Sequence, residues 1–154
     1  MKFVLLIIAI LFTPPLHAKD YVVGEISDSR IMEEFEKFKR HQDDVNYSEE
    51  ALAGLKAVTE QFQFKVFFGQ WCHDSQREIP RLIQLFNKVD KANFEVSYYA
   101  LDTQKSDPDG HAKLHNIKRT PTLIVFQDGK ELARVLEFPK VDWPSDLYEI
   151  LTAR

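Results

Sequence analysis

Residues 62–75 read FQFKVFFGQWCHDS and carry the strongest fold signal in this 154-residue chain. The aromatic and β-branched run Phe62–Phe68 has the length of a buried strand and is too short for a helix. Gly69 ends the run, and apolar residues then recur at helical spacing as far as Val89. The stretch therefore predicts a buried strand that turns sharply into a long helix, with Cys72 at the turn.

Strands and helices are also predicted on both sides of this stretch, and Pro80 predicts a kink within the long helix. Asp128-Gly129 is a strong signal for a hairpin turn between two strands. The remaining predicted elements, in chain order, are an edge strand over Tyr21–Ile26, a helix from Asp28 through Phe38, a helix from Ser48, a strand over Phe94–Leu101, a short helix over His111–His115, the hairpin strands Thr122–Phe126 and Glu131–Leu136, and a final helix over Asp142–Ala153.

Strands that alternate with helices and end in a hairpin predict an α/β fold, with a central mixed β-sheet flanked by helices on both faces. The length suits one domain, over residues 19–154, with 19–60 as an N-terminal extension with helices and 61–154 as the core. In open sheets of this kind ligands bind beyond the carboxyl ends of strands. The expected site is therefore the end of Phe62–Phe68, where Cys72 lies.

The first 18 residues have the layout of a secretory signal peptide. Lys2 gives a positive start, Phe3–Phe12 is an unbroken apolar run, and Ala18 ends a candidate cleavage site. The apolar run is shorter than the roughly 20 residues that span a bilayer. We therefore expect export to the periplasm and no stable membrane insertion after cleavage, although an uncleaved anchor is the alternative.

Cys72 is the only cysteine in the sequence, so no internal disulfide is possible. A lone cysteine in an exported protein is a buried inert residue, an intermolecular partner or a reactive thiol. A thiol at the first turn of a helix faces unpaired backbone N–H groups and the positive end of the helix dipole, which favour thiolate. His73 adds positive charge when protonated, whereas Asp74 opposes thiolate if it points inward. The position beside Trp71 predicts a reactive thiol.

Trp71-Cys72-x-x-Ser75 at a strand-to-helix turn resembles the Trp-Cys-x-x-Cys site of the thioredoxin superfamily. The segment His115–Phe126, which contains Thr120-Pro121-Thr122, resembles the second signature of that superfamily, and Asp128–Glu131 resembles its following hairpin. The resemblance covers roughly residues 60–152. It implies a thioredoxin-like fold, here with an added N-terminal helical segment.

The resemblance also implies roles for the matching residues. Cys72 matches the attacking thiol, Trp71 the aromatic residue beside it, and Thr120-Pro121 the cis-proline loop that pairs with an extended substrate peptide. Ser75 stands where a dithiol enzyme has its resolving cysteine, which makes this a CxxS site. Its hydroxyl can donate a hydrogen bond to the Cys72 sulfur. Val66 stands where many thioredoxins have a buried acid, and an apolar residue fits a protein that does not resolve its own mixed disulfide.

We therefore expect thiol–disulfide exchange through one thiol, by way of a mixed disulfide that a second thiol must resolve. The expected partners are protein or low-molecular-weight thiols and disulfides, and a lone thiol also allows a dimer linked through Cys72. The expected catalytic residues are Cys72, His73 and Ser75, and the expected substrate-binding residues are Trp71, Thr120 and Pro121.

Two other functions remain open from the sequence: a non-catalytic module that binds peptides or proteins, and an oxidant-sensing thiol that forms a sulfenic acid. No cofactor is implied. Metal-ligand residue types occur between Asp107 and His115, but their spacing fits a turn and a short helix, so no metal site is expected. The net charge of −4 and the lack of a Lys/Arg cluster argue against a nucleic-acid partner.

Overall fold

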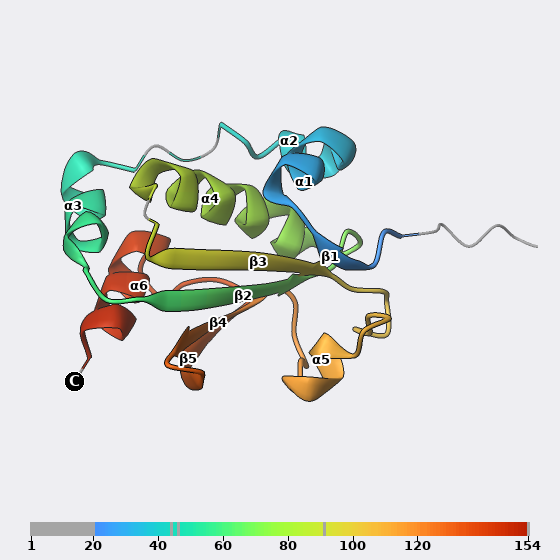
Figure 1. Cartoon of the computed structure of the whole chain (residues 1–154). Coiled ribbons are helices and arrows are strands. Elements are labelled where there is room, and N and C mark those ends of the chain that lie inside the picture. The colour runs from blue at the N-terminus through green and yellow to red at the C-terminus, as the bar shows by residue number, and fades with distance from the viewer. Residues whose placement is uncertain (1–20, 44, 46, 91, 154) are drawn as a thin grey trace, which may run out of the picture.

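The computed structural model describes residues 21–43, 45, 47–90 and 92–153, so the signal peptide predicted over 1–18 lies outside the described residues. Five strands form one sheet in the order β1-β3-β2-β4-β5 (Figure 1). β2 and β3 are parallel, and the other three pairs are antiparallel, so the prediction of a mixed α/β sheet is confirmed. The strands are β1 (Gly24–Ile26), β2 (Phe62–Phe68), β3 (Phe94–Ala100), β4 (Thr122–Gln127) and β5 (Lys130–Leu136).

The central strand β2 is buried because β3 and β4 pair with its two edges. Its side chains alternate between the two faces of the sheet, as a pleated strand requires. Phe64, Val66 and Phe68 belong to the larger hydrophobic cluster, whereas Phe67 belongs to a smaller cluster on the other face. This alternation fixes the register of β2 and therefore the point at which the strand ends.

Helices cover the two faces of the sheet unequally (Figure 1). The larger cluster collects apolar side chains from five helices, whereas the smaller one is closed by α5 and the segment that follows it. The helices are α1 (Asp28–Glu34), α2 (Glu36–Lys39), α3 (Glu49–Ala57), α4 (His73–Val89), α5 (His111–Leu114) and α6 (Trp143–Thr152). None of the helices in the described ranges is long and apolar enough to cross a membrane.

The single helix predicted from Asp28 through Phe38 is wrong, because the chain forms two short helices that meet at Phe35. Phe35 leaves the helical region with φ −101° and ψ 89°. This break turns the rings of Phe35 and Phe38 into the core, where both contact Phe68 at the end of β2. Apolar spacing alone did not reveal the break, since Phe35 and Phe38 are both buried, as they would be in one continuous helix.

Two other local predictions concern Pro80 and the hairpin turn. At Pro80, where the sequence predicted a kink, α4 is not interrupted but continues as one helix, and Pro80 itself is buried. Asp128 and Gly129 both have positive φ, 50° and 76°, and join β4 to β5 in the predicted hairpin. Positive φ at both central residues is the requirement of the tight turn that matches strand twist.

The contact between Phe38 and Phe68 predicts how strongly the short α2 supports the core. We expect Phe38→Ala to lower the free energy of unfolding by about 3–5 kcal/mol, because a fully buried ring is lost and the site cannot collapse completely. Urea denaturation measures this change. Leu114→Ala is the control, since Leu114 is 75% exposed and should cost less than about 0.5 kcal/mol. Equal losses in both variants would contradict the described packing.

Candidate functional site

Cys72 lies at the turn between β2 and α4, as the sequence predicted. It is the N-cap residue of α4, with extended backbone angles of φ −85° and ψ 123°. Its carbonyl accepts the first helical hydrogen bond, from Gln76 N–H at 3.0 Å, and its own N–H donates to Gly69 C=O at 3.0 Å. These two bonds anchor the cysteine backbone on both sides and leave the side chain partly exposed.

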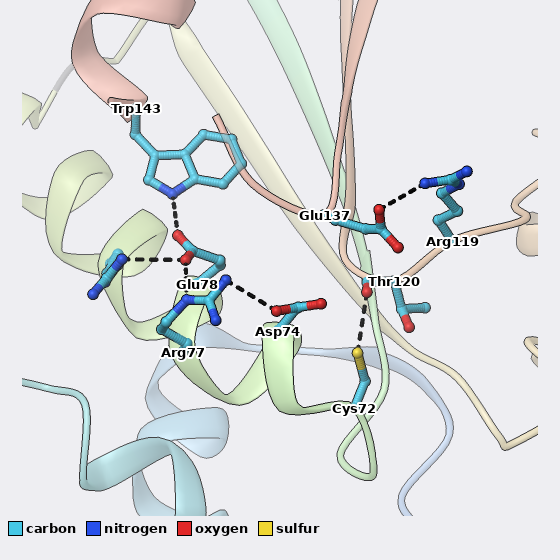
Figure 2. A network of polar contacts seen from close by, with 9 residues as sticks. Cys72, Asp74, Arg77, Glu78, Arg119, Thr120, Glu137 and Trp143 are labelled. Carbon is cyan, nitrogen blue, oxygen red and sulfur yellow. Dashed lines mark hydrogen bonds and ion pairs between the residues drawn. The ribbon is translucent and has the colours of Figure 1, made fainter. Parts of the chain in front are cut away.

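The Cys72 thiol faces a segment that is distant in sequence. Its Sγ donates to the carbonyl oxygen of Thr120 across 3.1 Å (Figure 2). The peptide bond between Thr120 and Pro121 is cis. Two further hydrogen bonds stabilise this loop. Pro121 C=O accepts from Glu137 N–H at 2.7 Å, and the Thr122 hydroxyl donates to Arg119 C=O at 2.8 Å. The structure thus brings Cys72, Thr120 and Pro121 together at one edge of the sheet.

The sulfur is bound differently from the expectation for a helix N-terminus. As the N-cap side chain it accepts no hydrogen bond from the first backbone N–H groups of α4. Its hydrogen bond to Thr120 uses the thiol proton instead, so the resting sulfur is held as a donor. The N-terminus of α4 can therefore stabilise a Cys72 thiolate only through the helix dipole in this arrangement.

The expected hydrogen bond from Ser75 to the Cys72 sulfur does not form. Ser75 is fully buried, and its hydroxyl oxygen accepts from Gly69 N–H at 3.2 Å. Within the described residues, no hydrogen bond joins Ser75 to Cys72. The reason is that a helical side chain leans toward the preceding turn, where the Ser75 hydroxyl meets the Gly69 N–H. Ser75 therefore supports the loop that carries the cysteine.

Trp71 packs against the same loop. Its indole N–H donates to Leu101 C=O at 3.2 Å, and Lys105 Nζ lies 5.6 Å from the ring centroid. A Cβ atom placed on Gly69 would lie 2.6 Å from Trp71 Cε2, so only glycine allows the indole to lie this close. The tryptophan is thus held by packing and by one hydrogen bond beside Cys72.

The charged residues at the start of α4 differ in exposure. His73 is exposed at the first helical position. Asp74, two residues after Cys72, is partly buried and pairs with Arg77 across 2.9 Å, so its carboxylate has a cationic partner. Val66 is completely buried within β2, which leaves an apolar side chain where the resemblance suggested a buried acid in other proteins.

Sequence reasoning missed Glu78, a buried acid on α4. Its side chain is only 2% exposed. Its carboxylate accepts from Trp143 Nε1 at 2.9 Å, from Arg77 Nε at 2.6 Å and from Arg81 Nη1 at 3.2 Å (Figure 2). The spacing of Asp74, Arg77, Glu78 and Arg81 along one helix was the available signal, but it could not reveal that α6 covers Glu78 with a tryptophan.

Asp107, in the segment of metal-ligand residue types before His115, serves local structure. Both carboxylate oxygens of Asp107 accept backbone N–H groups, from His111 at 3.0 Å and from Ala112 at 2.6 Å, so Asp107 satisfies the first two N–H groups of α5, whose N-cap residue is Gly110. In the described part of the chain, no group of three or more His, Cys, Asp or Glu side chains could hold a metal ion.

A cysteine that follows the central strand of a mixed sheet, in contact with a cis-proline loop before the neighbouring strand, is typical of the thioredoxin fold. The chain belongs to the thioredoxin family, because the sequence profile of that family, described as thioredoxin, matches residues 25–143. This assignment associates the chain with thiol–disulfide redox chemistry in general terms. Among curated proteins, none matches the chain.

Solved structures with a similar fold come from several organisms. A protein of unknown function from Pseudomonas aeruginosa is 15% identical, with a TM-score of 0.58 over 76% of this chain and 74% of that chain. Trxlp from Edwardsiella tarda is 24% identical, with a TM-score of 0.47 over 69% of this chain and 95% of that chain. Mitochondrial thioredoxin 3 from Saccharomyces cerevisiae is 18% identical, with a TM-score of 0.43 over 62% of this chain and 81% of that chain. At 15% identity, the similarity to the Pseudomonas aeruginosa protein supports the fold alone.

The close contact between Gly69 and Trp71 makes the loop sensitive to one methyl group. We expect Gly69→Ala to displace the indole, to change its fluorescence and to lower the free energy of unfolding by about 1–3 kcal/mol, because the added Cβ overlaps the ring. Gly110→Ala is the matched control. Gly110 has φ 77° with nothing within 4 Å of an added Cβ, so it should cost about 1 kcal/mol of backbone strain and leave the fluorescence unchanged. An unchanged indole signal in Gly69→Ala would refute the contact.

Proposed function

We propose that this chain is an exported, periplasmic thioredoxin-family protein that carries out thiol–disulfide exchange through the single thiol of Cys72. The observation that carries the proposal is the contact of the Cys72 sulfur with the loop of Thr120 and Pro121 at 3.1 Å. This contact gives the one cysteine a partly exposed position beside a backbone segment that is suited to receive a substrate strand. Membership of the thioredoxin family supports the reaction class.

The proposed reaction has two exchange steps. The Cys72 thiolate attacks one sulfur of a substrate disulfide; a new S–S bond forms, and the other substrate sulfur leaves as a thiolate that takes up a proton. A second thiol, from a low-molecular-weight thiol or a partner protein, then attacks the substrate sulfur of this mixed disulfide and releases Cys72. Each step breaks one S–S bond and forms another, so no further oxidant or reductant is needed.

The loop around Cys72 gives each neighbouring residue a role in this proposal. When Cys72 loses its proton, Thr120 C=O loses its present donor and becomes available to an N–H group of an extended substrate. Pro121 C=O is already used by Glu137 N–H, so Thr120 supplies the free acceptor of the loop. Trp71 is held beside Cys72 by its bond to Leu101 C=O, and His73 is exposed, where its protonated ring would favour the thiolate.

Ser75 is the reason for a single-thiol mechanism. Its hydroxyl is not a useful nucleophile toward a disulfide, and it is buried and bonded to Gly69 N–H. A mixed disulfide at Cys72 therefore waits for an external thiol.

A second candidate function is a non-catalytic module that holds a peptide in the groove beside Pro121. The observation that favours it is the donated hydrogen bond from the thiol to Thr120, together with the lack of an N–H donor from α4 on the sulfur. An oxidant-sensing thiol is the third candidate, since Cys72 is partly exposed. Turnover with disulfide substrates separates the first function from these two.

The role of Ser75 leads to a gain-of-function prediction. We expect wild-type protein to reduce insulin slowly with dithiothreitol as terminal reductant, because every turnover needs dithiothreitol to attack the mixed disulfide from solution, and no internal thiol speeds this release. Ser75→Cys should form an internal disulfide with Cys72, since one helical turn separates the two positions, and should raise the rate at least about tenfold. Mass spectrometry and insulin turbidity measure the two effects.

Two controls accompany this experiment. Thr152→Cys adds an exposed second cysteine at the end of α6 and should neither form an internal disulfide nor gain activity. Cys72→Ser should remove all activity and keep the fold. Fast turnover by the wild type, or the lack of an internal disulfide in Ser75→Cys, would contradict the mechanism.

Export gives a separate prediction about the mature protein. If residues 1–18 are a signal peptide, material from the periplasm should begin near Lys19, and its intact mass should lack the first 18 residues. A variant with Lys2, Leu5 and Leu6 changed to polar uncharged residues should stay in the cytoplasm at full length, because the apolar run and its positive flank are lost. Full-length protein in the membrane fraction would instead favour an uncleaved anchor.

A further inference from the structure

The first turns of α4 carry a chain of charged contacts that begins beside Cys72 (Figure 2). Asp74 Oδ1 accepts from Arg77 Nη2 at 2.9 Å, and Arg77 Nε donates to Glu78 Oε1 at 2.6 Å. One guanidinium therefore bridges two carboxylates. A planar guanidinium can do this because its donors leave in different directions from one rigid group.

Glu78 fixes the inner end of this bridge. Its side chain is 2% exposed, and its second oxygen accepts from Trp143 Nε1 on α6 at 2.9 Å. Hydrogen bonds from charged and ring N–H donors therefore satisfy both oxygens of this buried side chain. The pKa of Arg77 is raised, first by its hydrogen bond to Glu78 and then by the charges of Glu78 and Asp74, although burial acts against this. Arg77 is therefore a permanent cation whose position is set by the interior.

We infer that Arg77, held by Glu78, is a positioning residue that fixes and neutralises the Asp74 carboxylate, two residues after Cys72, and thereby favours the reactive thiolate. This inference rests on the proposed function only in taking the thiolate as the reactive form of Cys72. Without Arg77, Asp74 would be an uncompensated negative charge in the first turn of α4. Like charge at short range disfavours a second anion.

The other charged groups around Cys72 do not replace Arg77 in this role. Arg119 and Glu137, on the segments before β4 and after β5, bind each other at 2.8 Å and form a self-neutralised pair on the opposite side (Figure 2). Lys105 lies over the ring of Trp71, and His73 is exposed on α4. Arg77 is thus the cation that the structure pairs with Asp74.

The test is the rate at which iodoacetamide alkylates Cys72 as a function of pH. The sulfur displaces iodide, and the sequence has one cysteine, so the readout reports this site alone. We expect Arg77→Gln to lower the rate at pH 7 roughly threefold and to move the whole profile to higher pH. In the Asp74→Asn background the same substitution should have little effect, and Arg77→Lys should restore part of the wild-type rate. Lys56→Gln, which breaks an exposed ion pair on α3 at the far end of α4, is the matched control and should leave the profile unchanged.

The outcomes separate a positioning role from a structural one. A lower melting temperature for Arg77→Gln with an unmoved pH profile would overturn the inference, and so would an equal shift in the wild-type and Asp74→Asn backgrounds. Alkylation requires no disulfide substrate. If Arg77→Gln moves the alkylation profile but the protein fails every exchange assay, this inference is supported and the proposed function is refuted. If the protein has exchange activity but Arg77→Gln leaves the profile unmoved, the proposed function is supported and this inference is refuted.

Discussion

The burial of β2 between β3 and β4 is the constraint on which the site depends. Val66 pairs with Tyr98 on one side and with Leu123 on the other, so both edges of the strand are bound. A shift by one residue would turn the phenylalanines of β2 to the wrong face of the sheet. The end of the strand at Phe68 is therefore fixed, and Gly69 and Cys72 follow at a defined place. The same register brings β4, and with it Pro121, to the sulfur.

The unequal covering of the sheet explains how distant parts of the chain act on one thiol. Five helices pack against one face, and two of them, α4 and α6, meet through Glu78 and Trp143. A polar contact inside this layer is thereby linked through Arg77 to the first turn of α4. The opposite side of the site is made by the loop before β4. Cys72 lies where these two parts meet, so its surroundings are set by tertiary packing as well as by its own helix.

The sequence predicted the elements whose signals are local. β2, the hairpin at Asp128 and Gly129, and the position of Cys72 at a helix start follow from apolar spacing and turn chemistry. The break at Phe35 was missed because spacing does not distinguish one helix from two that bury the same residues. The hydroxyl of Ser75 was assigned to the wrong partner, since its choice of Gly69 depends on three-dimensional geometry. The burial of Glu78 depends on α6, which is distant in sequence.

The central claim is that Cys72 forms a mixed disulfide that persists until another thiol arrives. The most direct measurement is the intact mass of folded wild-type protein after exposure to oxidised glutathione and removal of all free thiol. The account predicts one glutathionyl group on Cys72, stable during hours of incubation and released quickly by added reduced glutathione. A folded protein that stays unmodified, while the unfolded protein reacts under the same conditions, would contradict it.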